Sequence, residues 1–417
     1  MEIKTGYKQT DVGIIPDDWV VISLRVLAVI ATGTTPSTKD RSNYGSDYFF
    51  VSPADLGKGK YITNTETKLS EKGFAVSRKF PQDSILFTCI GSTIGKSGIA
   101  PKELTSNQQI NAISPDDRFC TDYLYYALNL LAPIIKSLAA VEAVPIIKKS
   151  DFEKTLVALP PTKAEQTAIA TALSDVDALI TTLEKLIAKK RNIKQGVMQQ
   201  LLTGKKRLPG FSGKWEVKRL GEVFQFLSTA TNPHSDLTEY GSVKYIHYGY
   251  IHTRASSFLD CEKEGLPFID ASKVRNIPFL EDGDLLMVDA SEDYVGLGKS
   301  IEVRNAGKNV IAGLHTLLLR SDKDALSDGF KGYLQFVPEF RQSLVRIATG
   351  ISVYGISKNN LKGIEVHLPD IKEQSAIAQV LSDMDAEIEE LEHKLTKYKS
   401  IKQGMMQELL TGKTRLI

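Results

Sequence analysis

A seven-residue stretch of this chain comes close to a phosphate-binding loop. The stretch is Gly91-Ser-Thr-Ile-Gly95-Lys96-Ser97, and it has three residues between its glycines, where a nucleotide-binding loop needs four. A related triplet begins at Gly298, with Asp293 in place of the first glycine. We therefore favour a turn that closes two strands at each place, with Lys96 and Lys299 available to contact phosphate groups.

No other group of residues predicts catalysis or a metal site. The run from Asn232 to Ser235 lacks the second proline and the aromatic residue of an amino-methyltransferase motif. His247 and His252 lie five residues apart, which suits neither one helical face nor one strand face, so base contacts or polar surface are favoured over a metal. No Ser/His/Asp or Cys/His set stands out, although spacing alone does not exclude one. We expect no catalytic residue, no metal and no cofactor on this chain.

Polar residues on loops are candidates for contact with DNA, because Arg, Lys, Asn, Gln and His side chains bind phosphates and base edges. The plainer alternative for each of them is solvated surface. The candidates of the first half are Thr34, Thr35, Lys39, Arg41, Asn43, Lys58, Lys60, Lys96, Asn107, Gln108 and Gln109. Those of the second half are Lys244, His247, Tyr248, His252, Arg254, Lys273, Arg275, Tyr294, Lys299 and His315.

An internal duplication organises the elements that would position these residues. Residues 165–208 and 373–416 are identical at 27 of 44 positions at a constant offset of 208, which is far above chance. Both copies carry apolar residues at alternating spacings of three and four, which predicts long helices that pair antiparallel as a coiled coil. The predicted pairing residues are Ile169, Leu173, Val176, Ile180 and Leu183 in the first copy, and Ile377, Leu381, Met384, Ile388, Leu391 and Leu395 in the second.

Local signals mark both ends of each helix. The segments 162–165 and 370–373 read as capping boxes, with Thr and Asp as the respective caps. Gly204 and Gly412 lie where a left-handed residue would end a helix. Each helix would then have about 40 residues and a length of roughly 60 Å. Gly196 and Gly404 lie inside the helices, and we favour close helix–helix approach over a docking notch for another subunit as their explanation.

Two globular blocks flank the first helix. They share sparse markers, including the two tryptophans, Trp19 and Trp215, but differ elsewhere. Short β-rich runs at 48–51, 84–89 and 111–113, with a helical hairpin over 123–140, predict an α+β fold. The predicted segments are residues 1–160, 161–205, 206–369 and 370–417, in the order block, helix, block, helix.

Composition fits a cytoplasmic protein that binds nucleic acid only through local patches. The chain has 417 residues and a net charge of +2, but residues 161–220 carry 12 basic and 5 acidic groups. A chain this weakly charged needs patches or partners to bind DNA phosphates. Its three cysteines have no paired or metal-ligand spacing, its first residues are polar, and its apolar stretches are broken. These features predict a reducing compartment, no signal peptide and no membrane span.

The repeated segments resemble those of a known family, the specificity (S) subunits of Type I restriction–modification enzymes. The resemblance rests on GYKQTDVGIIPDDW near the start, LPPTKAEQTAIATALSDVDALI, IKQGVMQQLLTGKKRL and the second copy of these helical motifs. It covers nearly the whole chain. It implies two target-recognition domains of similar fold, separated by two long antiparallel helices with pseudo-twofold symmetry. Each domain would read one half of an asymmetric, bipartite site in double-stranded DNA.

The same resemblance implies partners. Two methyltransferase subunits would bind S-adenosylmethionine, and motor–nuclease subunits would use ATP and Mg. This chain would then be a non-catalytic adaptor in host defence that binds no cofactor itself. The alternative is a coiled-coil scaffold that organises partner proteins without reading DNA. Sequence-specific retention of DNA on co-purification with partners distinguishes the two.

Overall fold

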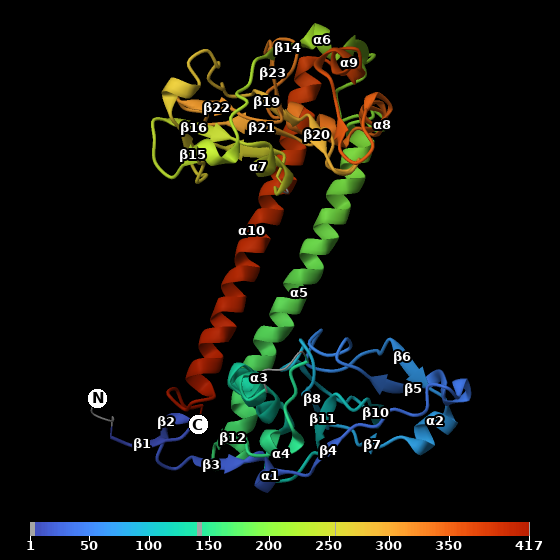
Figure 1. The fold of residues 1–417 in the computed structure, drawn as a ribbon, viewed down its shortest axis with the longest axis vertical. Helices are drawn as coiled ribbons and strands as arrows, with labels where there is room; N and C mark the ends of the chain where they lie inside the picture. The colour runs from blue at the N-terminus through green and yellow to red at the C-terminus, as the bar shows by residue number, and fades with distance from the viewer. Residues whose placement is uncertain (1–4, 140–143, 255, 417) are drawn as a thin grey trace. The chain divides into compact units, whose positions relative to one another are not determined.

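The chain folds into two compact units. A computed structural model describes residues 5–139, 144–254 and 256–416. Unit 1 comprises residues 1–184 and 393–417, and unit 2 comprises residues 185–392. Each unit combines one α+β globular block with half of each long helix (Figure 1). The predicted fold class is confirmed, although the compact units divide each helix that the sequence segments keep whole.

The two predicted long helices are α5 (Lys163–Leu201) and α10 (Ile371–Leu409), with 39 residues each. Their starts and their ends differ by 208, the offset of the duplication. Within each unit the two helices run antiparallel, and ion pairs join them at 2.6–2.7 Å. The pairs are Asp177–Lys402 and Glu184–Lys399 in unit 1, and Lys190–Glu387 in unit 2.

The globular block of unit 1 is rich in short strands. Its elements are β1 (Tyr7–Thr10), β2 (Gly13–Pro16), β3 (Val20–Ser23), α1 (Leu24–Leu27), β4 (Ile30–Thr32), η1 (Arg41–Asn43), β5 (Tyr44–Val51), β6 (Thr67–Leu69), α2 (Glu71–Val76), β7 (Lys79–Phe80), β8 (Ile85–Thr88), β9 (Ser97–Ile99), β10 (Leu104–Ser106), β11 (Ile110–Ile113), α3 (Thr121–Ser137), α4 (Lys149–Phe152) and β12 (Leu156–Leu159).

Two four-stranded sheets form the centre of this block. The strand orders are β4-β11-β8-β9, which is antiparallel, and β6-β5-β10-β7, in which β5 and β10 are parallel. Successive residues of β8 point to opposite faces, as a pleated strand requires. Ile85 and Phe87 face a core shared with α3 and α5, whereas Leu86 faces a second core with Val51 and Leu104. The predicted strands at 84–89 and 111–113 are confirmed within one residue of each end, and the strand predicted at 48–51 ends as predicted but begins four residues earlier, at Tyr44.

The globular block of unit 2 repeats this plan. Its elements are β13 (Glu216–Arg219), α6 (Leu220–Val223), β14 (Phe224–Leu227), η2 (His234–Asp236), β15 (Leu237–Thr238), β16 (Val243–Ile246), α7 (Tyr248–His252), β17 (Phe258–Asp260), β18 (Phe268–Ile269), η3 (Ala271–Lys273), β19 (Leu285–Val288), β20 (Ala290–Ser291), β21 (Ser300–Arg304), β22 (Val310–Ala312), β23 (Thr316–Ser321), η4 (Lys331–Phe336), α8 (Pro338–Ile347), β24 (Tyr354–Gly355), α9 (Lys358–Lys362) and β25 (Glu365–Leu368).

The sheets of the two units correspond strand by strand. The order β14-β23-β19-β21 in unit 2 matches β4-β11-β8-β9 in unit 1, and β17 extends it. The parallel pair β16–β22 matches β5–β10, and the antiparallel pair β13–β25 matches β3–β12. The blocks therefore share one framework despite their divergent sequences.

The apolar stripes of the long helices lie in two environments. Ile169 and Leu173 are fully buried in the core of unit 1, together with α3 and Leu409 at the end of α10. In unit 2, Ile377 and Leu381 take the same place. The first turns of each helix are thus part of a globular core. Of the other predicted pairing residues, Ile180, Leu183 and Ile388 are buried, and Val176, Met384, Leu391 and Leu395 are half-buried.

An arginine ties the two helices together in each unit. In unit 1, Arg415 follows the end of α10 and binds Glu165 near the start of α5, with Nη2 2.8 Å from Oε2. Its guanidinium lies 5.8 Å from the ring centre of Trp19, and Glu165 is buried. The equivalent residues of unit 2 are Arg207, Glu373 and Trp215. This contact explains why these residues recur in both halves.

The predicted capping boxes form only in part, because their glutamates take part in the arginine contacts. Thr162 does cap α5, since its hydroxyl accepts the amide of Glu165 at 3.2 Å, and Asp370 caps α10 in the same way at 3.0 Å. The carboxylates of Glu165 and Glu373 bind arginines instead of the cap amides. A bidentate, charge-assisted pair with Arg is stronger than a bond to a neutral amide, which explains the difference.

The glycines at the helix ends behave as predicted. Gly204 and Gly412 have φ of +66° and +71°, the left-handed conformation that ends a helix. A Cβ on Gly412 would lie 2.5 Å from Pro16, so this position also needs the missing side chain.

Two other predictions were wrong. A Cβ on Gly196 or Gly404 would meet no atom within 4 Å, so these glycines do not allow a close helix contact within the chain. The predicted helical hairpin is a single helix, α3, that continues through Pro133. The buried face of α3 from Tyr123 to Leu128 holds it in place, and one proline removes only one backbone hydrogen bond. Ala140, the end of the predicted hairpin, lies outside the described residues.

None of the helices in the described ranges combines the length and apolar character that a membrane-spanning helix needs.

Candidate nucleic-acid interface

The same backbone contacts recur at one sheet edge of each unit. In unit 1 the loop from β8 to β9 begins at Cys89, whose amide donates to the carbonyl of Gln109 at 2.8 Å, and the amide of Thr88 donates to Lys96 at 2.9 Å. In unit 2, Asp289 donates to His315 at 3.3 Å, and Val288 donates to Lys299 at 2.9 Å. The structure thus makes Gln109 equivalent to His315, and Lys96 equivalent to Lys299.

Three histidines surround one tyrosine at this edge of unit 2, and a fourth histidine lies beside one of the three. Tyr248 begins α7, and its ring centre lies 4.3 Å from that of His247, 5.4 Å from that of His315 and 5.9 Å from that of His252. His234, on η2, lies 6.1 Å from His247. We call His234, His247, Tyr248, His252 and His315 the histidine cluster. Four of these five residues are candidates from the sequence, although they come from separate segments.

Burial and neighbouring charge shape the electrostatics of the cluster. Burial lowers the pKa of His247, and the positive charges that His234 and His315 can carry lower it further. His315 is held in a left-handed conformation with φ of +55°, and its Nδ1 lies 3.2 Å from Asp289. A neutral imidazole has one donor and one acceptor nitrogen, so the cluster can pair with either kind of group on a base edge.

Lys299 holds the histidine cluster in place through a hydrogen bond to the backbone of α7. Its Nζ donates to the carbonyl of His252 at 2.7 Å, and burial lowers its pKa. A Cβ on Gly296 would lie 2.8 Å from the His252 ring, so this loop can pack on α7 only with glycine there. Tyr294, on the same loop, stacks on Tyr354 with ring centres 4.0 Å apart.

The remaining cationic candidates of unit 2 mostly have internal partners. Lys244 donates to the carbonyl of Cys261 at 2.7 Å, and Lys273 pairs with Asp236 at 2.8 Å. Arg254 pairs with Glu264 and lies over the ring of Tyr250. These contacts stabilise the block, so the presence of these three residues does not require that they bind DNA. Arg275 is exposed.

At the equivalent edge of unit 1, threonine and glutamine residues come together. The hydroxyl of Thr35 donates to Gln108 at 2.5 Å, and that of Thr34 accepts the amide of Arg78 at 2.8 Å. Asn107 binds both the amide and the side chain of Gln109. We call Thr34, Thr35, Gln108 and Gln109 the threonine–glutamine edge.

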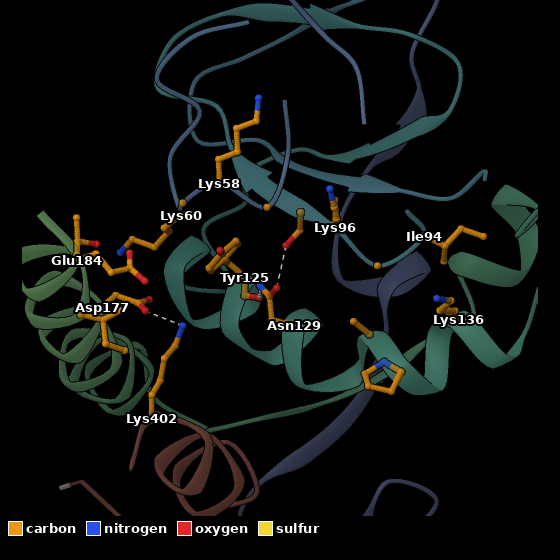
Figure 2. Close-up of a pocket in the computed structure, with 18 residues that line it drawn as sticks. Lys58, Lys60, Ile94, Lys96, Tyr125, Asn129, Lys136, Asp177, Glu184 and Lys402 are labelled. Atoms are coloured by element: carbon orange, nitrogen blue, oxygen red, sulfur yellow. Dashed lines mark hydrogen bonds and ion pairs between the residues drawn. The ribbon is translucent and has the colours of Figure 1, made fainter. Parts of the chain in front are cut away.

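The other candidates of unit 1 lie in two further places. Lys39 and Arg41 are exposed on the loop around η1, whereas Asn43 is buried and donates to the carbonyl of Ser37 at 3.1 Å. Lys58, Lys60 and Lys96 line a cavity of about 660 Å³ beside α3 and α5 (Figure 2). The structure thus gathers the candidates of this block into an edge, a loop and a pocket.

Sequence reasoning missed several residues at these places. Arg78 donates to the carbonyl of Thr32 at 2.7 Å beside the threonine–glutamine edge. Lys136 and Lys402 line the same cavity as Lys58, Lys60 and Lys96, which we call the lysine pocket. His234 lies in the run from Asn232 to Ser235 and is not among the residues predicted to contact DNA. The short separation of His234 from His247 across η2 and β16 is a signal that could have linked them.

These sites are suited to recognition. Among the described residues, no three His, Cys, Asp or Glu side chains form a group that could hold a metal ion. Burial raises the pKa of the thiols of Cys89 and Cys261 to about 12, which keeps both neutral and unreactive. Both edges offer hydrogen-bond donors and acceptors, and the edge of unit 2 adds the aromatic rings of the histidine cluster and Lys299.

Fold and site together define a duplicated α+β recognition protein. The chain belongs to the family of the Type I restriction modification DNA specificity domain, whose model matches residues 16–195 and again residues 212–402. The resemblance found in the sequence is thereby confirmed.

Whole-length relatives support this assignment. The chain is 26% identical to the Type I restriction enzyme MjaVIII specificity subunit of Methanocaldococcus jannaschii, over 96% of this chain and 94% of that protein. It is 22% identical to the EcoKI specificity subunit of Escherichia coli, over 95% and 89%. With the MjaIX specificity subunit of M. jannaschii it shares 30% identity over 56% of this chain, a match that spans 58% of that relative.

A solved structure has the same fold. The S subunit of a Type I restriction–modification system from M. genitalium superposes with a TM-score of 0.59 at 16% identity, covering 98% of both chains.

Proposed function

We propose that this chain reads a bipartite, asymmetric DNA site, one half with each unit, and that it does so as a non-catalytic subunit. The observation that carries the proposal is the equivalence of the two edges. The same backbone contacts present Gln109 in unit 1 and His315 in unit 2. Two copies of one framework with different polar residues at the same place would read two different half-sites.

The residue types fit base reading. A glutamine amide can pair with both N6 and N7 of adenine, and threonine can contact base edges or the thymine methyl group. Imidazole and lysine donate to the O6 and N7 acceptors of guanine. The threonine–glutamine edge and the histidine cluster would therefore prefer different bases.

The long helices offer two equivalent docking positions for methyltransferase subunits. Ile193 on α5 and Ile401 on α10 are 44% and 39% exposed, and they are related by the offset of 208. Each lies three residues before Gly196 or Gly404, where a Cβ would meet open space. An exposed isoleucine beside an open glycine forms a small apolar notch on each helix. Two equal notches fit two copies of one partner.

Catalysis and cofactors would belong to the partners in this scheme. Methyltransferase subunits would bind S-adenosylmethionine, and motor–nuclease subunits would bind ATP and Mg. The purified chain should therefore show no methyl transfer from S-adenosylmethionine to DNA; transfer by the chain alone would contradict this part of the proposal.

The docking proposal is tested by Ile193→Asp and Ile401→Asp. Each places a charge in one notch, so each should remove one methyltransferase subunit, and the double variant should remove both. Asn192→Asp and Ser400→Asp add the same charge at the neighbouring exposed positions and serve as controls. The subunit ratio of the co-purified complex gives the result. Full assembly of the double variant would rule out these positions.

Sequencing of methylated bases in the host tests the reading of DNA. A host that carries the chain with its methyltransferase subunits should methylate one bipartite sequence, and deletion of the chain should abolish that methylation. If the complex assembles but DNA is methylated without a defined sequence, the chain is a scaffold that does not read DNA.

A further inference from the structure

Five lysines line the pocket between α3, α5 and two loops of unit 1. Lys58 and Lys60 come from the loop after β5, Lys96 from the loop before β9, Lys136 from α3 and Lys402 from α10. All five lysines are labelled in Figure 2. The pocket that they line has a volume of about 660 Å³. A volume of this size matches a small-molecule site, and its lining selects for negative charge.

Two of the five lysines are held by acidic partners in unit 1. Lys60 donates to Ser174 at 2.7 Å and pairs with Asp122 at 3.2 Å. Lys402 pairs with Asp177 at 2.6 Å. These ion pairs fix the positions of these two ammonium groups.

The other lysines are not neutralised in this way. Within the described ranges, Lys96 and Lys136 have no recorded ion pair or side-chain hydrogen bond, and Lys58 reaches only Glu66, at 3.6 Å. The lining carries five lysines against two acids, Asp177 and Glu184, which gives a net charge of +3. Glu184 itself pairs with Lys399 from outside the pocket. An excess of positive charge therefore remains at the rim.

Glycines keep the rim open. Gly57 has φ of +79°, and a Cβ there would lie 3.3 Å from the Lys96 side chain. Gly95 has φ of +100° and faces Ala132 of α3 at 3.4 Å. Side chains at these positions would need a strained backbone and would crowd Lys96 and α3.

The equivalent place in unit 2 is different. Lys299, which corresponds to Lys96, is bonded to the carbonyl of His252. Glu389 of α10 stands at the position that Thr181 of α5 occupies, four residues after the shared aspartate. The open, positively charged pocket is thus not required by the shared framework, which argues for a separate role in unit 1.

We propose that this pocket binds phosphate groups and takes two or more of them at once. Lysine ammonium groups bind phosphate as point charges, and several of them converge here from four segments. The phosphates can belong to a free polyphosphate, such as a nucleoside triphosphate, or to consecutive nucleotides of a DNA backbone. Both have the same chemistry at the pocket, and neither requires that unit 1 reads bases.

Binding of inorganic tripolyphosphate to the full-length protein, measured by titration calorimetry, tests the proposal. We expect saturable binding of one molecule. Lys96→Ala combined with Lys136→Ala should weaken it at least about tenfold, because two charged partners are lost. Lys96→Arg combined with Lys136→Arg should retain it within about threefold.

The control removes the same charge elsewhere in unit 1. Lys148 and Lys163 are exposed and lie outside the pocket, so Lys148→Ala combined with Lys163→Ala should change binding less than about twofold. Absence of saturable binding, or equal weakening in both alanine pairs, would overturn the proposal.

A second titration identifies the source of the phosphates. A short duplex that lacks any methylated target sequence is added to the protein loaded with tripolyphosphate. Displacement by the duplex assigns the pocket to DNA backbone, whereas simultaneous binding assigns it to a free polyphosphate. Methylation without a defined sequence in a host that carries the assembled complex, by contrast, would count against the proposed function and would leave the result of this titration unaffected.

Discussion

A glutamine and a histidine occupy the same place in the two units. The backbone carbonyl of Gln109 accepts the amide of Cys89, the residue after β8. The backbone carbonyl of His315 accepts the amide of Asp289, the residue after β19, in the same way. Because the backbone around them is shared, the difference between the two edges lies in side chains and loops. Base preference should accordingly change with single residues at these positions, without a change of fold.

The lowered pKa of His247 gives unit 2 a pH-dependent stability. Burial is the main cause, so the folded unit takes up this proton at a lower pH than the unfolded chain, whose histidine has a pKa of about 6.5. Between these two values the unfolded state holds more protons, and the free energy of unfolding therefore rises with pH. The contribution of His247 to the free energy of unfolding is complete above about pH 6.5. It is lost as the pH falls through the lowered pKa of His247 in the folded unit.

Urea unfolding of a Trp19→Phe chain between pH 5 and 8 measures this effect, because the fluorescence then reports Trp215 in unit 2. His247→Asn should flatten the pH dependence, and His367→Asn, at an exposed position on β25, should preserve it. Equal slopes for His247→Asn and its parent would show that another group is responsible.

At the level of helices and sheets, much of the identity between the two long helices has an internal cause. Arg415 binds Glu165 across unit 1, and Tyr126 donates to Asp177 at 2.7 Å, with Lys402 on the same carboxylate. Unit 2 repeats each contact with Arg207–Glu373 and with Tyr333, Asp385 and Lys194. These repeated residues hold helix to helix and helix to block, whereas the repeated Ile193, Ile401 and open glycines are the positions that the docking proposal uses.

Local patterns could predict the helices but not these contacts. Helix ends depend on neighbouring residues, so Gly204 and Gly412 were predictable. Arg415 and Glu165 are 250 positions apart, and no local rule pairs them. The sequence already related Lys96 to Lys299, but the equivalence of Gln109 and His315 was hidden, because these two residues differ by 206 positions whereas the helices differ by 208. Loop insertions changed the offset, and only strand pairing restores the correspondence.

Leu173 should be a main anchor of α5 in unit 1. It is fully buried in the core that includes Tyr123 and Phe87. Leu173→Ala removes buried methyl groups and leaves a cavity, so it should lower the free energy of unfolding by about 3 kcal/mol. Leu179→Ala, at a side chain 37% exposed on the same helix, should cost less than about 1 kcal/mol. Chemical denaturation compares the two; equal losses would mean that the start of α5 is not anchored in the core.

If the helices set the spacing of the half-sites, then longer helices should lengthen the unread spacer. Four residues inserted after Lys189 in α5 add roughly 6 Å and about one turn, so the apolar stripe nearly keeps its face. A matching insertion after Glu392 in α10 keeps the antiparallel ion pairs in register, including Lys190–Glu387 and Arg191–Glu392 on one side and Glu184–Lys399 on the other. The methylated sequence should gain one or two base pairs between unchanged half-sites. An unchanged spacer with full activity would show that the helices do not determine it.

On the scale of the whole molecule, duplication gives one chain two units that share a framework and differ in their polar edges. The framework of sheets, arginine contacts and helix starts is common to both units. The edges, the histidine cluster and the lysine pocket are not. If each unit reads one half-site, as we propose, such a chain should be able to change one half of its target while the other half stays the same.

The most direct test replaces residues 20–150 with the equivalent region of a relative that has a different target. This segment carries the whole threonine–glutamine edge and leaves α5, α10 and unit 2 intact. The host's methylated bases are then sequenced with the same methyltransferase subunits present. Our account predicts that one half of the bipartite sequence changes to that of the relative, while the other half is retained. A change in both halves, or in neither, would contradict it.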